Sequence, residues 1–499
     1  MLSNWLAFAA TSVVSFFLSP FVIGHLGDSA YGVWVLMGSL TGYMGLLDLG
    51  VRGAVTRYVA SFHTQRNHQE ASRVVSAALL IFVGLGLVAV GIAVALAFLA
   101  LKSFNIPLEF QKSAQIVLIL SGLTVATSLI GGVFGGVIAG LQRFDRTNAI
   151  EISTTLLRSA AVVIALAGGR GLVSLSLIHL FFSSLALTLN LIVSRRTYPE
   201  LRPQFGELDR RYFQIIFSFS AYAFLLHISN YLIFYTDSVV IGAVLPISSV
   251  TFFGIAGNLI NYSRALVSGI STTMTPMMSS LQAAGAKVEL ERVLLKGMRY
   301  ATLIVLPIGI TFIVRGHTFI SLWMTPRLAD HSSPLLTILT VALFFAAATQ
   351  VATAAVLGMN RHKSLVPIVL AEAIANLGLS IILVRRMGIV GVAWGTALPS
   401  LAVSLLFWPI YMRSALSINT FRLLSSTWIR PAIALLPFAA CTVAIDRFFP
   451  PANLAMFFFQ VAAALPFALF GAWYVSLLPD ERQQCLHLVS KLLPSVGGE

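Results

Sequence analysis

The sequence predicts an all-α polytopic membrane protein with about 14 transmembrane helices. Hydrophobic residues make up 58% of the 499 residues, whereas Asp, Glu, Lys and Arg together make up only 10%, and the mean hydropathy is +0.89. A soluble domain is about 25% charged, so a soluble protein of this length needs far more charge on its surface. Secreted scaffolds, coiled coils and disordered chains are excluded, and lipid is expected to be the main solvent.

Apolar runs divide the whole chain. One spanning helix needs about 20 apolar residues, and runs close to or above this length fall at 5–23, 31–50, 76–101, 114–139, 148–167, 172–193, 214–243, 250–280, 299–314, 335–357, 365–384, 389–411, 428–445 and 455–477. The weakest is 250–280, which carries Asn258, Asn261 and Arg264. The first run has no preceding Lys or Arg and no clean cleavage site, so we expect an uncleaved helix rather than a signal peptide. The short loops leave no room for a soluble catalytic domain.

Lys and Arg residues are distributed unevenly between the predicted sides of the membrane. With the N-terminus in the cytoplasm, the cytoplasmic loops carry 21 of them and the opposite loops carry 8, with Arg315 counted on the outer side. Because cytoplasmic loops are enriched in basic residues, both termini are predicted to be cytoplasmic. The net charge of +14 is therefore interpreted as membrane orientation, and nucleic acid is not an expected partner.

An internal repeat divides the chain into two halves. "GLQRFDRTNAIEI" from Gly140 lies 218 residues before "GMNRHKSLVPIVL" from Gly358, and the same offset places Ile23-Gly24 on Ile241-Gly242. An even number of helices in each half keeps both halves in the same orientation. The predicted regions are an N-terminal six-helix lobe at 1–194, a basic cytoplasmic linker at 195–211, a second six-helix lobe at 212–412, and two additional helices with a cytoplasmic tail at 413–499.

Enzyme signatures are missing from the sequence. It has no phosphate-binding loop, zinc signature or nucleophile elbow, so no catalytic residue, metal site or cofactor is expected. The two cysteines, Cys441 and Cys485, lie in different environments and predict no disulfide. The glycines of the fourth run share four-residue spacings, which let another backbone approach closely and indicate helix packing; they are Gly131, Gly132, Gly135, Gly136 and Gly140.

Four ionisable side chains lie well inside apolar runs: Arg158, Asp237, Arg264 and Glu372. Each costs about 2.5–3.5 kcal/mol at the centre of a spanning helix on insertion scales, so each should face a cavity or a partner. Arg158 and Arg264 lie near mid-membrane, where they either line a cavity or form internal ion pairs. The sequence leaves both interpretations open.

Three further charged residues, Asp48, Arg52 and Glu151, lie nearer the cytoplasmic ends of their runs. The two acids are interpreted as interfacial or capping groups. Arg52 is followed by Arg57 in the same basic segment.

The segment "LGDSAYGVWVLMGSLTGYMGLLDLGVRGAVTRYVA" from Leu26 resembles the start of the oligosaccharide (polysaccharide) flippases of the multidrug/oligosaccharidyl-lipid/polysaccharide exporter superfamily. The fourteen runs and the two halves agree with this resemblance. It implies transfer of an undecaprenyl-diphosphate-linked oligosaccharide unit across the bacterial inner membrane for surface polysaccharide (O-antigen, capsule or exopolysaccharide) biosynthesis. It also implies alternating access of two lobes around a cationic cavity.

Candidate site residues are assigned from charge and depth, because the family has no strict catalytic signature. The expected substrate-binding residues are Arg52, Arg57, Arg158 and Arg264, and the candidate ion-coupling residues are Asp237 and Glu372. The driving force is left open between Na⁺, H⁺ and the membrane potential. Expected partners are the lipid-linked oligosaccharide, membrane lipids, and polysaccharide polymerase and assembly proteins.

Alternatives from other functional classes stay open. A multidrug or small-cation exporter of the same superfamily needs exposed carboxylates, and residues 5–23 contain neither Asp nor Glu. Flippases for the peptidoglycan lipid precursor carry basic residues near the first helix, whereas residues 1–51 contain no Lys or Arg here. An enzyme would need a large outer loop or clustered acids, and a scaffold within an assembly complex is the fourth alternative.

Overall fold

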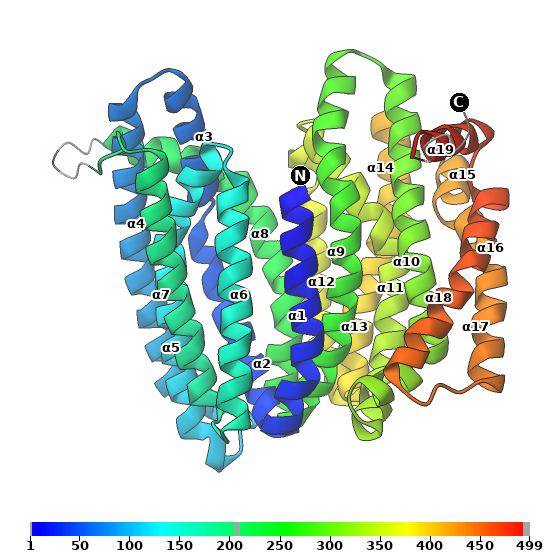
Figure 1. The fold of residues 1–499 in the computed structure, drawn as a ribbon, viewed down its shortest axis with the longest axis horizontal. Coiled ribbons are helices and arrows are strands. Elements are labelled where there is room, and N and C mark those ends of the chain that lie inside the picture. The colour runs from blue at the N-terminus through cyan, green and yellow to red at the C-terminus, as the bar shows by residue number, and fades with distance from the viewer. Residues whose placement is uncertain (1, 204–205, 207–209, 493–499) are drawn as a thin grey trace, which may run out of the picture. The chain divides into compact units, whose positions relative to one another are not determined.

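The structure is a computed structural model that describes residues 2–203, 206 and 210–492. Within these ranges every regular element is a helix, and no strand occurs (Figure 1). Eleven of the described helical stretches are long and apolar enough to cross a membrane, and two shorter apolar ones are Ala10–Leu26 and Tyr231–Val244. The prediction of an all-α polytopic membrane protein is confirmed.

Each of the fourteen predicted apolar runs falls mainly on helical residues, with single turns at positions such as 49–50 and 435, and the chain forms two compact units. Unit 1 comprises residues 1–254 and 366–395. Its helices are α1 (Leu2–Leu26), α2 (Asp28–Met44), α3 (Val51–Thr64), α4 (His68–Ala95), α5 (Leu108–Gly140), α6 (Phe144–Ala167), α7 (Leu172–Thr197), α8 (Arg210–Val244) and α12 (Val366–Met387).

Unit 2 comprises residues 255–365 and 396–499. Helices α9 (Ser248–Ala283) and α13 (Ile389–Ala402) begin in unit 1 and continue into unit 2. The others are α10 (Lys287–Trp323), α11 (Pro326–Gly358), α14 (Trp408–Leu416), α15 (Thr420–Leu424), α16 (Arg430–Ala434), α17 (Leu436–Phe448), α18 (Leu454–Gly471) and α19 (Pro479–Leu492). These units follow spatial contact, so the lobe boundaries predicted from the sequence stay a prediction.

A break between α2 and α3 shapes the interior of unit 1. A 3₁₀ turn at Gly45–Asp48 ends α2, and Leu49 and Gly50 follow in the left-handed region at φ 48° and 77°. The Asp48 Oδ1 atom accepts a hydrogen bond from the Gly50 N–H at 3.1 Å and stabilises this turn. Asp48 thus holds the turn rather than capping α3, which has no side-chain cap at its N-terminus, and its predicted interfacial or capping role stays a prediction. Helix α3 begins at Val51 beyond the break, with Arg52 in its first turn.

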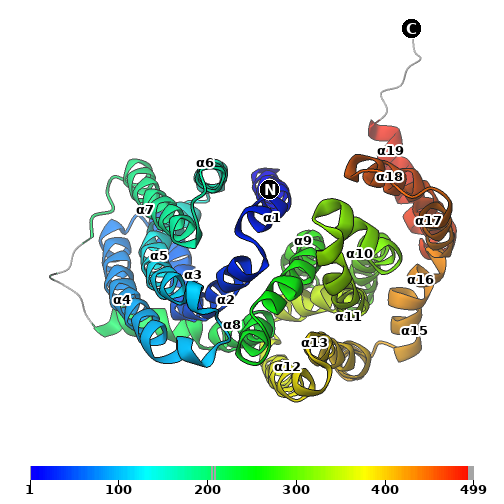
Figure 2. The same cartoon turned by 90° about the horizontal axis from the view of Figure 1, so that it is seen from below.

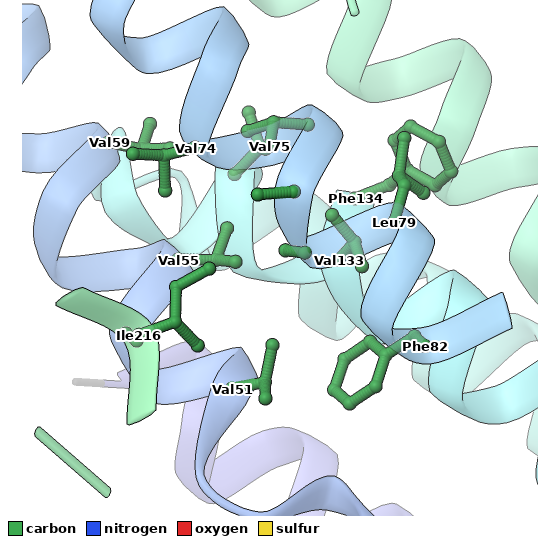
Figure 3. Close-up of a cluster of buried hydrophobic side chains, with 14 of the residues drawn as sticks. Val51, Val55, Val59, Val74, Val75, Leu79, Phe82, Val133, Phe134 and Ile216 are labelled. Atoms are coloured by element: carbon green, nitrogen blue, oxygen red, sulfur yellow. The ribbon is translucent and has the colours of Figure 1, made fainter. Parts of the chain in front are cut away.

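A valine-rich core holds α3 in place beside α4 and α5 (Figure 3). Val51, Val55 and Val59 recur every four residues on α3 and therefore share one face. They pack with Val74, Val75, Leu79 and Phe82 of α4, Val133 and Phe134 of α5, and Ile216 of α8.

The glycines of α5 permit close approach of neighbouring helices, as predicted. A Cβ atom on Gly136 would lie 3.2 Å from the carbonyl oxygen of Arg52, and one on Gly140 would lie 2.8 Å from that of Thr56. On another face, a Cβ on Gly131 would lie 3.2 Å from Leu187 of α7. Helix α5 is therefore packed between α3 and α7 at short backbone separation.

The repeat is visible in the geometry of α5 and α11. Both helices have 33 residues, and their ends are separated by the 218-residue offset of the sequence repeat. The residue two positions beyond each terminal glycine is left-handed, Gln142 at φ 58° and Asn360 at φ 56°. Both repeated segments thus fold as a long helix that ends in the same turn.

Buried ion pairs attach the C-terminal helices of unit 2 to α10. Arg299 pairs with Glu481 of α19, and both side chains are less than 10% exposed. Arg315 is 1% exposed and donates from Nε to Asp446 Oδ1 of α17 at 3.2 Å and from Nη2 to Gln460 Oε1 of α18 at 2.5 Å. Helices α17 and α18 lie side by side (Figure 2).

Arg315 was therefore placed wrongly by the sequence, which assigned it to an outer loop. Helix α10 continues to Trp323, and the Arg315 guanidinium is paired with side chains of α17 and α18. Its charge centre also lies 4.6 Å from the ring centroid of Phe457, a favourable distance for a cation–π contact.

Candidate functional site

A cavity of about 670 Å³ lies within unit 1, at the break between α2 and α3. Its walls come from α2, the 3₁₀ turn, α3, α5 and α8. The polar side chains among its lining residues are Thr41, Asp48, Arg52, Thr56, Ser128, Tyr231 and Tyr235, and the glycines are Gly42, Gly45, Gly50, Gly53 and Gly132. The volume lies in the range of about 300–1,000 Å³ that is usual for small-molecule sites.

Arg52 is the single Lys or Arg among the residues that line this cavity. It lies in the first turn of α3 and is solvent-accessible. Its side chain runs along α5: a Cβ on Gly132 would lie 3.7 Å from Arg52 Cδ, and one on Gly135 would lie 3.5 Å from Nη2. Among the described residues, the guanidinium has no acidic or hydrogen-bonding partner.

Asn190 of α7 lies beside Arg52 and was missed by the sequence analysis. Its Oδ1 atom is 3.7 Å from the Cβ position of Gly135, so it shares that glycine surface with Arg52 Nη2. Its Nδ2 atom donates to the Ala186 carbonyl at 2.8 Å, whereas Oδ1 is buried without a hydrogen-bond partner in the described part of the chain. A polar residue in an apolar run was the available signal.

Two tyrosines of α8 form another wall of the cavity. The rings of Tyr231 and Tyr235 are stacked, with centroids 5.3 Å apart and planes at 27°. Both rest against α2, where a Cβ on Gly42 would lie 2.6 Å from the Tyr235 ring and one on Gly45 would lie 2.5 Å from the Tyr231 hydroxyl. Only glycine leaves room for these rings, since real Cβ contacts are longer.

The other predicted substrate-binding residues do not line this cavity. Arg57 is exposed on α3, and Arg158 is half-buried on α6. The Arg158 side chain has no hydrogen bond or ion pair within the described ranges, although it interacts through space with Glu151 and with His179. His179 packs edge-on against Trp34 at 5.2 Å.

Arg264 is half-buried on α9, in unit 2. Arg158 belongs to unit 1, so the prediction that these two arginines line one cavity stays a prediction. The same holds for the substrate-binding role of Arg57.

The candidate ion-coupling residues lie on α8 and α12 of unit 1. Asp237 is 2% exposed, and its Oδ1 atom accepts a hydrogen bond from the Ser380 hydroxyl at 3.2 Å. Asn376, one turn before Ser380, is 1% exposed, and neither of its amide atoms has a hydrogen-bond partner among the described residues. Glu372 is half-buried one turn earlier. A buried carboxylate therefore lies on the same helix pair as an unsatisfied amide.

Solved structures of low sequence identity share this fold. The lipid II flippase MurJ in an inward closed conformation has a TM-score of 0.74 at 13% identity, covering 94% of this chain and 97% of its own. An inward-facing multidrug resistance MATE family transporter of the MOP superfamily has a TM-score of 0.67 at 14% identity, covering 82% and 95%. The chain therefore has the same fold as these two transport proteins.

Sequence comparisons define the family more narrowly. A family model described as "Polysaccharide biosynthesis protein" matches residues 26–330. A Shigella flexneri protein named as an O-antigen transporter is 20% identical over 420 residues, covering 82% of this chain and 96% of its own. The membrane protein EpsK of Bacillus subtilis (strain 168) is 23% identical over 423 residues, covering 82% of each chain. The chain belongs to this polysaccharide biosynthesis family, as a flippase-like membrane transporter, and the resemblance seen in the sequence is confirmed.

Proposed function

We propose that the protein transfers an undecaprenyl-diphosphate-linked oligosaccharide from the cytoplasmic to the outer leaflet of a bacterial inner membrane. The observation that carries the proposal is Arg52, a guanidinium without a protein partner among the described residues, on the wall of a cavity of about 670 Å³. An arginine fork binds phosphate oxygens in a bidentate, charge-assisted manner. The relatives' link to polysaccharide biosynthesis and O-antigen transport supports a phosphate that belongs to a glycolipid.

A wet polar cavity is required for this transfer. Each sugar hydroxyl that enters hydrocarbon without a hydrogen bond costs about 4–8 kcal/mol, so an oligosaccharide faces a cost of tens of kcal/mol. Spontaneous flipping is therefore negligible. The cavity supplies hydroxyl, carboxylate and guanidinium groups that replace water around the head group, while the lipid tail stays in the bilayer. Transport in this scheme needs no covalent chemistry and no cofactor.

The proposed orientation places both termini in the cytoplasm, because basic residues are concentrated in the loops of that side. Reporter fusions after residues 107 and 246 are expected to read as outside, and fusions after residues 68 and 288 as inside. A reversed pattern contradicts both the orientation and the proposed direction of transfer.

Energy coupling is proposed to involve Asp237. An inside-negative membrane potential is worth about 2.3 kcal/mol per charge per 100 mV, so outward movement of an anionic diphosphate is already downhill. Proton or Na⁺ binding at the buried Asp237 carboxylate would then reset the empty carrier. Asp237→Asn is expected to slow turnover without weakening substrate binding. Unchanged transport in an Asp237→Asn, Glu372→Gln double variant contradicts a coupling role for both acids.

A small-cation exporter is the second candidate, since Asp48 and two tyrosine rings in the same cavity suit an organic cation. Arg52 separates the two functions, because it repels a cation and attracts a diphosphate. The test compares Arg52→Ala, Arg52→Lys and the control Arg170→Ala, which removes an exposed arginine outside the cavity.

The expected outcome for Arg52→Ala is a normal amount of protein with a thirty-fold to several thousand-fold loss of affinity for a prenyl-diphosphate-linked sugar, equivalent to about 2–5 kcal/mol. Arg52→Lys keeps the charge but loses the fork and is expected to be intermediate. Unchanged glycolipid binding together with tighter binding of an organic cation in Arg52→Ala favours the exporter instead.

A further inference from the structure

We propose that Tyr231, Tyr235 and Asp48 form a sugar-binding subsite beside Arg52, in which the sugar next to the diphosphate is held. This inference rests on the proposed function and deepens it, because it divides the cavity into a phosphate-binding part and a neutral polyhydroxyl-binding part. The residues come from α8 and from the turn after α2, whereas Arg52 comes from α3.

Glycines of α2 fix the positions of the two tyrosine rings. Gly42 and Gly45 on α2 leave the space that the two rings occupy, since a Cβ at either position would lie 2.6 Å or less from a tyrosine atom. The rings are stacked on each other at 5.3 Å. Two rings fixed in this way keep their faces and hydroxyl groups in place at low entropic cost, because few rotamers fit the site.

The hydrogen-bonding capacity of this wall is unused. Neither the Tyr231 nor the Tyr235 hydroxyl has a hydrogen-bond partner among the described residues, although both residues line the cavity. Asp48 uses one carboxylate oxygen to accept from the Gly50 N–H, and its second oxygen accepts no bond within the described ranges. The Tyr231 hydroxyl lies against Gly45, which begins the turn that Asp48 ends.

These groups suit a sugar ring better than another phosphate. The hydroxyl groups of a pyranose donate to a carboxylate and to the oxygens of phenol groups, and the phenol O–H groups can donate back to the sugar oxygens. The C–H face of the sugar packs on an aromatic ring. A second phosphate is disfavoured by the Asp48 carboxylate, because like charges repel at short distance. An organic cation is disfavoured by Arg52 in the same cavity. A diphosphate joined to a neutral sugar suits both charged groups, because the phosphate pairs with Arg52 and the sugar hydroxyls donate to Asp48.

The experiment compares two kinds of probe on the purified full-length protein. One is a short-chain prenyl diphosphate without sugar, and the others are the same lipid diphosphate carrying glucose, galactose or N-acetylglucosamine. The variants are Tyr231→Phe, Tyr235→Phe, Asp48→Asn and Arg52→Ala. Tyr43→Phe is the matched control, because the Tyr43 hydroxyl is hydrogen-bonded to Thr236 and is not part of the cavity wall.

The wild-type protein is expected to bind at least one sugar-bearing probe more tightly than the bare diphosphate. Each Tyr→Phe change is expected to lower this ratio about three- to ten-fold through one lost hydrogen bond, and Asp48→Asn to lower it about ten-fold or more. The Asn side chain keeps the oxygen that accepts from the Gly50 N–H, and the Phe variants keep the aromatic rings. Each substitution therefore removes one functional group and preserves the local packing. Arg52→Ala should weaken both probes equally and leave the ratio unchanged.

Three results overturn the subsite: a wild-type protein that does not distinguish the probes, a ratio that survives in all three subsite variants, or a Tyr43→Phe variant that loses the ratio equally. Failure of the proposed function looks different. In that case Arg52→Ala binds both probes as tightly as the wild-type protein.

Discussion

Helices α5 and α11 occupy equivalent positions in the two copies of the repeat, yet their surroundings differ. In α5 the residues at positions 131, 132, 135, 136 and 140 are all glycine, whereas the equivalent residues of α11 are Thr349, Gln350, Thr353, Ala354 and Gly358. Glycines of α5 leave space for the Arg52 side chain beside a cavity. In α11 the Ala354 carbonyl accepts a hydrogen bond from Thr275 Oγ1 at 3.2 Å, and most of the helix is buried.

Arg52 of unit 1 and the two buried arginines of unit 2 differ in whether they are paired with an acidic side chain. In unit 1, Arg52 faces a cavity without a protein partner among the described residues. In unit 2, Arg299 and Arg315 of α10 are buried and paired with Glu481 and Asp446. Unit 1 keeps space and charge available for a ligand at this cavity, whereas unit 2 uses these two arginines to attach the C-terminal helices. Variants of these residues should therefore affect different properties.

The largest effect is expected for Arg299→Ala in unit 2. Removing one partner of a buried ion pair leaves an uncompensated charge and costs about 3–5 kcal/mol. We expect a large fall in protein abundance and in the midpoint of thermal unfolding in detergent. The double variant Arg299→Met, Glu481→Gln is expected to recover most of the stability, because it removes both charges.

Arg422→Ala is the matched control for this prediction. Its partner Glu291 also lies on α10, and Arg422 Nη1 is 2.7 Å from Glu291 Oε1. The Arg422 side chain is 66% exposed, however, and exposed ion pairs contribute only about 0–1 kcal/mol to stability. If the two single variants lose the same stability, burial of the Arg299–Glu481 pair does not explain the effect.

A second large effect is expected for Arg158→Ala, but on transport rather than stability. No ion pair or hydrogen bond holds this side chain among the described residues, so we expect normal abundance. A substrate-binding role of Arg158, which does not line the cavity at Arg52, implies a cost of about 2–5 kcal/mol on its removal, which is a loss of glycolipid affinity of thirty-fold or more. Arg264→Ala in unit 2 should be measured alongside for abundance and glycan export. A fall in Arg158→Ala abundance that Glu151→Gln restores would instead assign Arg158 to an internal ion pair.

A smaller effect on stability is expected for Gly358→Ala. A Cβ at this position would lie 2.2 Å from the Thr275 backbone oxygen, and overpacking of this kind costs about 1–3 kcal/mol. The thermal midpoint should fall while the affinity for a prenyl diphosphate stays unchanged. Gly257→Ala on α9 is the control, because a Cβ there meets nothing within 4 Å. A Gly257→Ala variant that loses as much stability would show that the effect is not caused by this contact.

The sequence predicted the helices well because an apolar run of membrane length has few alternatives to a helix. It also predicted the packing role of the α5 glycines, since their spacing alone determines which helix face they occupy. It failed at Arg315, where the apolar run ends before the helix does. Burial of that arginine depends on Asp446 and Gln460, which are more than a hundred residues distant in the chain.

The cavity was beyond the reach of sequence reasoning for a related reason. Charge and depth selected Arg52, Arg57, Arg158 and Arg264 together, but only the break at Gly45–Gly50 determines that Arg52 lines the cavity. Tyr231 and Tyr235 have the spacing of one helix face, yet their wall requires glycines on a different helix. Contacts between distant segments decide such sites, and a single sequence does not show them.

The smallest effect is expected for Gly135→Ala, and it tests how Arg52 is held. The added methyl group would lie 3.5 Å from Arg52 Nη2 and 3.7 Å from Asn190 Oδ1, both ordinary contact distances. Stability should therefore be unchanged or slightly higher, because alanine favours a helix over glycine by up to about 1 kcal/mol. The methyl group occupies the surface that the guanidinium shares with Asn190. Because a packed site responds to the addition of even one carbon atom, the affinity for a prenyl diphosphate should fall about two- to five-fold. Gly84→Ala on α4 is the control, because its methyl group would meet nothing within 4 Å and Gly84 does not line the cavity. Equal affinities in the two variants would show that the surface at Gly135 does not position Arg52, whereas a selective loss in Gly135→Ala would show that the glycine surface unique to the first copy of the repeat contributes to binding.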